Sequence, residues 1–450
     1  MTAFAPTTVP AGAGEGARAG DPDGEPTAPS TTAHPHPFEG SGVVAAWLAL
    51  LGIALWWGRS SITGRGLGVG AAPLVGTWQW HATPWLALPA VVGALVVAFG
   101  PAAARRLSWP AVPLAAGLAA SAWTLALAAS DGWHRVTEPL TTRHEYEPFA
   151  ATIGGAGSFL RHFVARLPGS PIHVQGHPPG APLVPWGLDA VGLGGAGWFA
   201  ALVILGWGVA ISAALVAGRA VGGEAVARRA APALVLLPAA VWAGTSADAL
   251  FAGVLAIGVA FAVAARRSSA IGGGIVLALG MLLTYGGLAV AAIPGLVQLR
   301  RRRWTTVALA VGAVVAALVS VALVSGFSWI DGLGATHRAY EHGVASERPG
   351  RYFALAGNPA ALALAVGPAV AVGLRAAVRR RQDAAVLLPL VALLVVLAVD
   401  ASSLSKGEVE RIWLPFVPWL ALAAPGDRRG WLVAQVSVAL LLQAWLRSSW

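Results

Sequence analysis

Residues 304–325 read WTTVALAVGAVVAALVSVALVS and directly follow the basic cluster Arg300 to Arg303. A helix needs about 20 consecutive apolar residues to cross the hydrocarbon core of a bilayer, and this run is long enough. No side chain within it carries a charge, so none has to reach water. The stretch therefore predicts a membrane-spanning helix that begins beside a cluster of positive charge.

The composition of the whole chain agrees with this interpretation. Of its 450 residues, 56% are hydrophobic and only 11% are charged, and the mean hydropathy is +0.68. Soluble domains carry about 25% charged residues, and one unusually apolar core does not account for so large a shortage. A soluble enzyme, a disordered scaffold and a peripheral protein with a single anchor are therefore excluded.

Apolar runs similar to 304–325 recur from residue 43 to residue 446. They predict an all-α polytopic membrane protein with about 13 transmembrane helices, in a range of roughly 11 to 15. For the short runs that flank 245–248 and 284–287, tilted, kinked and re-entrant helices all remain open. The runs lie at residues 43–57, 84–101, 110–129, 197–217, 231–245, 249–265, 270–283, 286–299, 304–325, 359–377, 384–400, 412–424 and 431–446.

Arginine clusters predict the orientation of these spans. Short loops that are rich in Arg stay on the cytoplasmic side of a membrane. Such clusters stand in alternate turns between the runs, at residues 105–106, 219–229, 266–267, 300–303, 375–381 and 428–429. We therefore expect a multi-pass protein of the cell membrane with a cytoplasmic N-terminus. Topology also accounts for the net charge of +10, so no nucleic-acid partner is expected.

The chain divides into two parts. Residues 1–40 are rich in Pro, Gly, Thr and Ala and have no apolar run, which predicts a disordered cytoplasmic tail. Residues 41–450 form the transmembrane domain, with extracytoplasmic loops at 130–180, 326–357 and 401–411. The second loop mixes aromatic, acidic and basic side chains. This mixture is typical of a loop that contacts a sugar or phosphate, and equally of a plain polar loop. Cysteine is absent, which leaves no disulfide and no cysteine nucleophile.

Most acids and histidines fall in the extracytoplasmic loops, whereas the cytoplasmic turns hold little except Arg. An active site is therefore expected on the extracytoplasmic face. In the first loop, Arg143 and His144 precede Glu145 and Glu147, and a partly desolvated carboxylate at a membrane surface is a sound general base. An ordinary solvated loop is the alternative. Residues 157–167 carry apolar side chains at helical spacing and predict a helix in the plane of the interface.

Two histidines follow in the same loop. His173 and His177 are four residues apart, but Gly176 and the double proline at 178–179 argue against a helix, so helical metal ligation does not apply. A zinc site would also need a third protein ligand nearby. No cofactor is assigned, and a role for a divalent metal stays open.

Acidic and basic residues also stand at the ends of later spans. Asp248 lies between two short runs, where an acid either faces a cavity or a partner or marks the water end of a tight hairpin. Lys406, the sole lysine, and Arg411 stand at the outer mouth of a span beside Glu408 and Glu410. Basic residues are unfavourable at that end, so either the glutamates pair with them or a phosphate ligand does.

Several of these features resemble one family. Gly176-His177-Pro178-Pro179-Gly180 is similar to the H-P-P-L and K-P-P-L motifs of protein O-mannosyltransferases and related lipid A sugar transferases, with Gly180 in place of Leu. Asp248, and the piece from Glu408 to Arg411 at the start of a span, are similar in placement. The chain thus resembles the GT-C class of integral membrane glycosyltransferases over about residues 84–424.

This resemblance implies a glycosyltransferase that moves a sugar from a polyprenyl-phosphate donor to a cell-envelope acceptor. Glu145 or Glu147 would be the catalytic base, in place of the family's adjacent Asp-Glu pair. Arg411, Lys406 and Arg143 would bind the donor phosphate and stabilise the leaving group. The other substrate-binding positions would be His144, His173, His177, Asp248, Glu408 and Glu410.

Two other functions remain open. A secondary transporter or flippase for a lipid-linked or small polar substrate would use ionisable residues near the midplane and broken helices, and Asp248, Asp400 and the short spans near Thr284 fit this function. Because nearly all charges lie in loops, the sequence favours the transferase. The third function is a non-catalytic scaffold derived from a glycosyltransferase, since one changed carboxylate can remove activity.

Overall fold

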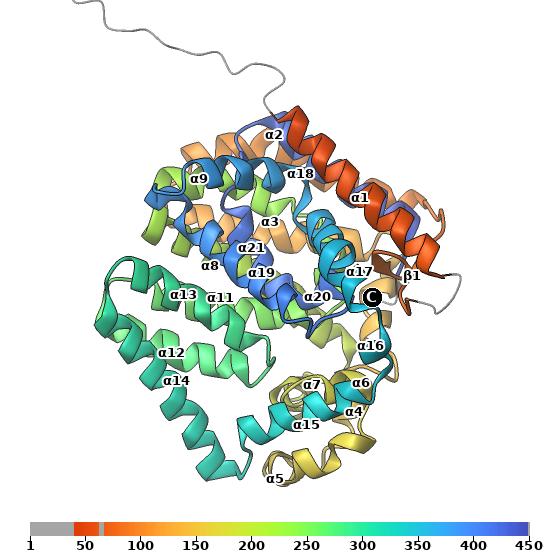
Figure 1. Ribbon diagram of the computed structural model, residues 1–450, viewed down its shortest axis with the longest axis vertical. Helices are drawn as coiled ribbons and strands as arrows, with labels where there is room; N and C mark the ends of the chain where they lie inside the picture. Colours follow the sequence, from red (N-terminus) through yellow and green to blue (C-terminus); the bar gives the residue numbers. More distant parts are fainter. Residues whose placement is uncertain (1–39, 63–66, 449–450) are drawn as a thin grey trace, which may run out of the picture. The chain divides into compact units, whose positions relative to one another are not determined.

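The structure is a computed structural model of the chain, and it describes residues 40–62 and 67–448. Helices make up most of these residues, so the prediction of an all-α chain is confirmed (Figure 1). Residues 1–39 lie outside the described part, and with them nearly all of the predicted cytoplasmic tail.

Seven helical segments of the described chain are long and apolar enough to cross a membrane, which confirms a polytopic membrane protein. The predicted number of about 13 crossings is not confirmed. The segments are α1 (Ser41–Ile62), η1 (Pro84–Leu86) with α2 (Ala87–Arg106), α3 (Ala111–Ala128), α8 (Ala196–Gly222), α14 (Trp304–Ser325), α17 (Gly350–Tyr352) and η5 (Phe353–Gly357) with α18 (Asn358–Arg379), and η6 (Ala384–Val386) with α19 (Leu387–Ala401).

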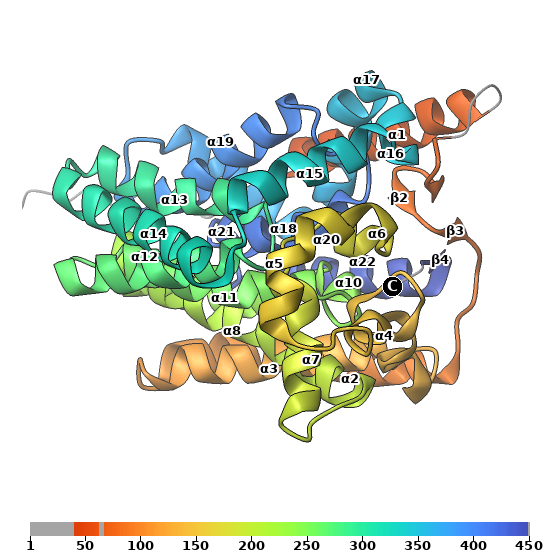
Figure 2. The same ribbon diagram turned by 90° about the horizontal axis from the view of Figure 1, so that it is seen from below.

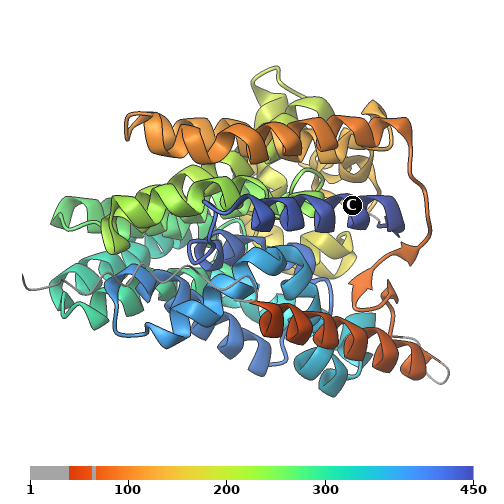
Figure 3. The same ribbon diagram turned by 90° about the horizontal axis from the view of Figure 1, so that it is seen from above.

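Four other predicted spans are single helices of lesser length. They are α11 (Asp248–Ala262), α12 (Arg267–Met281), α13 (Gly287–Arg300) and α22 (Arg429–Trp445). Figure 3 shows α22 beside α2, against which it packs. The runs that flank 245–248 and 284–287 are thus short helices joined by turns.

Two predicted spans are broken by proline. The run 231–245 is divided into α9 (Glu224–Val235) and α10 (Ala240–Ala243), and the run 412–424 into α20 (Val409–Ile412), η7 (Leu414–Phe416) and α21 (Val417–Ala421). Proline lacks the N–H that continues a helix. Both breaks are buried in protein, where such backbone finds partners: the Ala239 N–H donates to the Ala365 carbonyl at 2.8 Å. Of the possibilities left open for the run 231–245, the structure thus has the broken helix, and the run 412–424 is broken as well.

Short elements fill the loops that the sequence placed outside the membrane. Figure 2 shows that α4, α5 and α6 gather on the same side as α16 and α20. The short helices are η2 (Trp133–Val136), η3 (Glu138–Thr141), α4 (Tyr146–Ala150), α5 (Ala156–Arg166), η4 (Leu167–Gly169), α6 (Ile172–Gln175), α7 (Gly180–Ala190), α15 (Trp329–Glu341) and α16 (Val344–Glu347). We call this side the outer end of the helices.

The helix predicted over 157–167 is present as α5, but its apolar face packs on protein. Phe159 and Phe163 are buried, and their rings stack edge-on at a centroid distance of 5.5 Å. Phe163 continues the stack onto Phe327 at 5.7 Å. The apolar stripe therefore belongs to the core of the protein.

Two small two-stranded sheets connect the first span to the rest of the outer end. Strand β1 (Gly70–Ala71) pairs antiparallel with β2 (Leu74–Val75), with Gly70 opposite Val75. Strand β3 (Thr77–Trp78) pairs antiparallel with β4 (Leu446–Arg447), with Thr77 opposite Arg447. The segment after α1 is thereby held against the C-terminal end of α22.

The arginine-rich turns contact one another at the opposite end, which we call the inner end. Arg228 Nη1 donates to the carbonyls of Ala104 and Leu107, at 2.7 and 2.9 Å, and the guanidinium of Arg219 lies 4.6 Å from the centre of the Trp109 ring. These contacts join turns that are distant in the sequence. The sorting of Arg to one end agrees with the predicted topology, and the assignment of that end to the cytoplasm stays a prediction.

The core is built around α8, which packs against α3 and α11. Gly206 on α8 and Gly253 on α11 let these two helices approach closely: a Cβ at Gly206 would lie 2.6 Å from Leu250 Cα, and one at Gly253 would collide with the Gly206 carbonyl oxygen. Small residues permit such backbone contact between membrane helices. The crossing fixes the position of Asp248, the first residue of α11.

Candidate functional site

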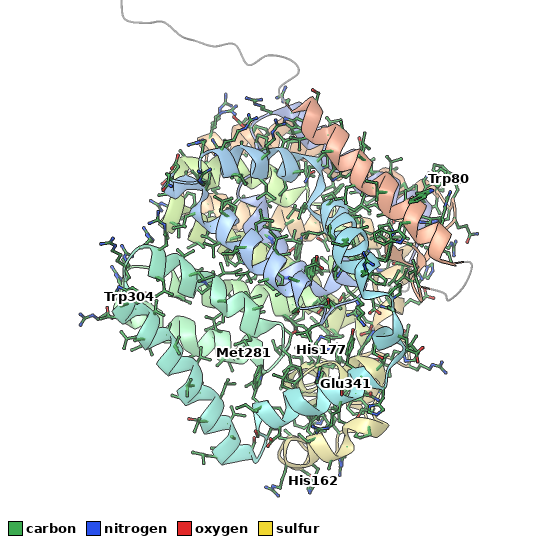
Figure 4. All side chains as sticks on the ribbon, in the orientation of Figure 1. Trp80, His162, His177, Met281, Trp304 and Glu341 are labelled. Carbon is green, nitrogen blue, oxygen red and sulfur yellow. The ribbon has the colours of Figure 1, made fainter. Side chains whose placement is uncertain are left out.

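Six ionisable side chains meet at the outer end of the helices. They come from three segments that are far apart in the sequence: the loop before α7, the start of α11, and α20 with the residue before it. All six are buried or nearly so: Glu145, His173, His177, Asp248, Glu408 and Arg411. In Figure 4, His177 lies in the interior of the protein, whereas His162 on α5 points away from it.

Local backbone structure places the two histidines. Contrary to the expectation from Gly176 and the prolines, residues Ile172–Gln175 form one helical turn, α6, which carries His173. The side-chain Nδ1 of His177 donates to the His173 carbonyl at 2.9 Å, and the His177 backbone N–H donates to the Val174 carbonyl at 3.3 Å. The Gly180 N–H then donates to the Leu282 carbonyl at 3.0 Å, and a Cβ at Gly180 would collide with that oxygen. Glycine at position 180 therefore permits this contact.

Glu145 and His173 form a buried pair. His173 Nδ1 lies 2.8 Å from Glu145 Oε1, and the two side chains are 13% and 8% exposed. His173 Nε2 faces Arg411 Nη2 at 3.4 Å. Because an arginine N–H only donates, Nε2 accepts and the ring proton lies on Nδ1, directed at Glu145. The hydrogen bond therefore holds the Glu145 carboxylate in a fixed orientation beside the imidazole.

Asp248 anchors Arg411 from the other side. Arg411 Nη1 donates to Asp248 Oδ2 at 2.8 Å, and Ser246 Oγ donates to the same oxygen at 2.7 Å. His177 Nε2 lies 3.7 Å from Asp248 Oδ1. The sequence left open whether Asp248 faces partners or marks the water end of a hairpin. In the structure it faces partners. A charge buried this deeply needs such partners.

Glu408 bridges two arginines. Its Oε2 accepts from Arg411 Nη2 at 3.0 Å, and its Oε1 accepts from Arg348 Nη2 at 3.2 Å. Burial raises the pKa of the Glu408 carboxyl, but Arg411 and Arg348 outweigh that effect and hold the pKa below its usual value. The backbone of Glu408 is left-handed, with φ of 61°, which costs about 1–3 kcal/mol for a residue that is not glycine.

Arg348 and Asn358 fasten the segment that carries Glu408. Arg348 Nη1 donates to the Lys406 carbonyl at 2.8 Å, and Lys406 Nζ donates to the Ser346 carbonyl at 2.7 Å. Asn358 Nδ2 donates to Asp400 Oδ1 at 2.9 Å, and the Gly407 N–H donates to Asn358 Oδ1 at 3.1 Å. Lys406 thus lies beside the cluster and holds a loop, rather than joining the ion pairs.

Glu410 is buried on the far side of the same short helix. Its Oε1 accepts from the Val75 N–H at 2.8 Å, and its Oε2 is buried without a hydrogen-bond partner in the described part of the chain. Burial raises the pKa of this carboxyl to about 7. Glu410 therefore ties β2 to α20 instead of lining the cluster.

The ring of Tyr146 packs beside both histidines. It packs edge-on against His177 at 5.6 Å and lies 6.4 Å from His173, measured between ring centres. Burial raises the pKa of the Tyr146 hydroxyl well above its usual value, so this group stays protonated at neutral pH. Tyr146 and Ser246 were not predicted as site residues, and the only sequence signal for either is its position beside Glu145 or Asp248.

Three predicted site residues lie away from the cluster. Glu147 is half-buried in the first turn of α4, and among the described residues no ion pair or hydrogen bond joins its side chain to the six. Arg143 and His144 are exposed and bond to each other, with 3.2 Å between Nε and Nε2. Of the two candidate bases, the structure therefore brings only Glu145 to the histidines and Arg411.

The candidate site has no ready metal centre. No group of three or more His, Cys, Asp or Glu side chains in residues 40–62 and 67–448 is arranged to share a metal ion. The carboxylates of the cluster are instead directed at guanidinium and imidazole groups.

Fold and site together define a polytopic membrane protein with a buried carboxylate–histidine–arginine cluster at the end opposite its arginine-rich turns. No protein-family model and no curated protein matches the chain. Solved structures to which it is similar include ArnT from Cupriavidus metallidurans bound to undecaprenyl phosphate, at 16% identity and a TM-score of 0.43, and the same protein in its apo state, at 19% and 0.42.

Each of these matches covers 71% of this chain, and they cover 60% and 59% of the ArnT chain. The chain therefore spans about three fifths of the length of ArnT.

Proposed function

We propose that the chain is a membrane glycosyltransferase that moves a sugar from a polyprenyl-phosphate donor to a hydroxyl group of a cell-envelope acceptor. The observation that carries the proposal is the line of contacts Glu145–His173–Arg411, which places a buried carboxylate and a buried guanidinium on the two sides of one imidazole. Sugar transfer needs these two groups, a base for the acceptor and a cation for the departing phosphate.

Glu145 is the proposed general base. It takes the proton of the acceptor hydroxyl as that oxygen bonds to C1 of the sugar and the bond from C1 to the phosphate oxygen breaks. His173 donates to Glu145 Oε1 and so orients the carboxylate, which leaves Oε2 to face the acceptor. Attack from the side opposite the phosphate inverts the configuration at C1. Glu147 has no such support, so Glu145 is the favoured candidate.

Arg348 and Arg411 are the proposed phosphate-binding pair. Their guanidinium groups already hold one anionic group between them, the Glu408 carboxylate, whose side chain is 23% exposed. A donor phosphate that replaces Glu408 would keep both arginines paired and would place the leaving group beside Arg411. Asp248 keeps its hydrogen bond with Nη1 of Arg411 and so fixes the orientation of the guanidinium plane. Bidentate contact with arginine suits a phosphate.

The test is transfer of labelled sugar by the full-length protein in lipid nanodiscs, with a panel of sugars on polyprenyl phosphate and an envelope extract as acceptor. Undecaprenyl phosphate is the first carrier to use. We expect transfer or slow donor hydrolysis from at least one donor. Gradient-dependent uptake in vesicles, with neither transfer nor hydrolysis, would contradict the proposal and favour the transporter. Donor binding without turnover in the presence of acceptor would favour the scaffold.

A further inference from the structure

A second polar pocket lies at the outer end of the helices, between α5, the turn that follows α14, and α15. It encloses about 400 Å³ and is lined by Arg161 and Val164 of α5 and by Asp331 and Arg338 of α15, with Gly326 between them. None of its lining residues belongs to the cluster around Arg411. It is therefore a separate feature of the molecule.

Each of the two arginines that line this pocket lies beside a glycine. A Cβ at Gly326 would lie 3.4 Å from Cγ of Arg161, and a Cβ at Gly334 would lie 3.5 Å from Nη1 of Arg338. Gly326 also ends α14 in a left-handed conformation, with φ of 77°. The stem of Arg161 thus lies against the residue that follows α14, at the outer end of that apolar helix.

An apolar groove runs from this pocket along the membrane-facing helices. It lies between α13 and α14, encloses about 650 Å³, and shares Ser328 and Ile330 with the polar pocket. Its wall on α14 extends from Thr306 to Ala322, a length of about 24 Å at 1.5 Å per helical residue. Figure 1 shows that α14 starts beside the end of α13, diverges from it, and ends near α5 and α15.

The groove opens toward lipid. Thr306 is the only buried residue of α14 among those described, and Val311, Val315 and Val319 on the groove wall are 50% to 55% exposed. A helix that is apolar all round and unburied must be covered by hydrocarbon. The groove and the pocket therefore form one continuous site, apolar over its length and cationic at its outer mouth.

We propose that this site binds one phospholipid of the adjacent leaflet, with its phosphate between Arg161 and Arg338 and one acyl chain in the groove between α13 and α14. Two guanidinium groups suit a lipid phosphate, which offers several acceptor oxygens. Asp331, in the same pocket, suits a headgroup that donates hydrogen bonds, so the occupant is of the phosphatidylethanolamine kind. The bound lipid joins α5 to α14 and α15.

The test adds phosphatidylethanolamine to the delipidated full-length protein and measures the retained lipid by native mass spectrometry. The variant is Arg161→Gln/Arg338→Gln, and the matched control is Arg166→Gln, an exposed arginine of the same helix that does not line the pocket. We expect one retained lipid for the wild type and the control, and at least about tenfold weaker binding for the double variant.

Equal lipid retention by the double variant and the wild type would overturn the proposal. So would displacement of phosphatidylethanolamine by equimolar undecaprenyl phosphate, because the site would then belong to the carrier lipid. The melting temperature of each variant serves as a check on folding. Since all of these side chains are exposed, we expect it to be unchanged. Sugar transfer is not needed for this measurement, so its result is independent of the proposed enzymatic function.

Discussion

Arg411 is the residue through which the ion pairs of the candidate site connect. It contacts Asp248 through Nη1 and both Glu408 and His173 through Nη2, and its side chain is only 7% exposed. A buried guanidinium with two carboxylate partners is held firmly, because breaking either ion pair leaves an uncompensated buried charge. Binding of a donor phosphate must therefore replace one of these partners.

Glu408 is the partner that we expect to be replaced. It is the more exposed of the two carboxylates, and its left-handed backbone is strained. Glu408→Gln removes the negative charge that competes with the phosphate. We expect the variant to bind polyprenyl phosphate more tightly, by roughly threefold to tenfold, in a titration of the protein in nanodiscs. Weaker binding than wild type would show that Glu408 assists the phosphate instead of competing with it.

Glu410 gives a pH-dependent contribution to stability. Its pKa is about 7 in the folded protein, above the ordinary value of 4.5, so the folded state favours the protonated carboxyl. The contribution of this group to the free energy of unfolding is therefore fully present below about pH 4.5 and is lost as the pH rises through about 7. Glu410→Gln keeps the acceptor for the Val75 N–H and cannot ionise. We expect the variant to match wild type near pH 5 and to exceed it at pH 9 by up to about 3 kcal/mol.

Thermal unfolding followed by tryptophan fluorescence, at a series of pH values, checks this expectation. Glu147→Gln, a half-buried acid outside the cluster, is the control and should show no such pH-dependent gain. A Glu410→Gln curve parallel to that of wild type from pH 5 to pH 9 would mean that the Glu410 carboxyl stays in one charge state over that range.

At the scale of elements, the crossing of α8 and α11 carries Asp248 to the site. Gly253→Ala forces these helices apart, because the new Cβ would collide with the Gly206 carbonyl oxygen. We expect a loss of about 1–3 kcal/mol in stability and a fall in any transfer activity. Gly272→Ala, on α12 with open space around its Cβ position, should leave both unchanged. Melting temperature and activity of the two variants provide the comparison.

Element prediction from the sequence succeeded where the apolar pattern was long and unbroken. The run 304–325 has the same bounds as α14, because a charge-free stretch between Arg303 and Gly326 has one stable conformation in a membrane. The runs around Pro238 and Pro415 are broken helices, because burial in protein supplies the partners that broken backbone needs. Hydropathy alone does not distinguish burial in protein from contact with lipid.

The candidate site was predictable in part. Glu145, Asp248 and Arg411 could be selected as ionisable residues near the outer ends of spans. Their contacts could not be predicted, because Arg411 is 238 residues from His173 and 163 residues from Asp248 in the sequence. The exclusion of Glu147 from the cluster also required the structure, since it depends on which side of the short helix α4 each acid lies.

At the scale of the whole molecule, the arginine-rich turns at the inner end predict how the protein is oriented in the membrane. The chain has no cysteine, so single cysteines report accessibility without background. We expect Arg143→Cys, at the exposed outer loop, to react with a membrane-impermeant maleimide on intact spheroplasts. Arg302→Cys, in the turn between α13 and α14, should react only after the membrane is opened. The reverse pattern would contradict the predicted orientation.

The proposed function depends most on Glu145 as the group that takes the acceptor proton. The most direct measurement compares the turnover rates of wild type, Glu145→Gln and Glu147→Gln with the donor that the panel identifies. Glu145→Gln should lower kcat by roughly 100-fold or more while donor binding is kept, and Glu147→Gln should remain close to wild type. Equal turnover by Glu145→Gln and wild type, or a loss confined to Glu147→Gln, would contradict the account.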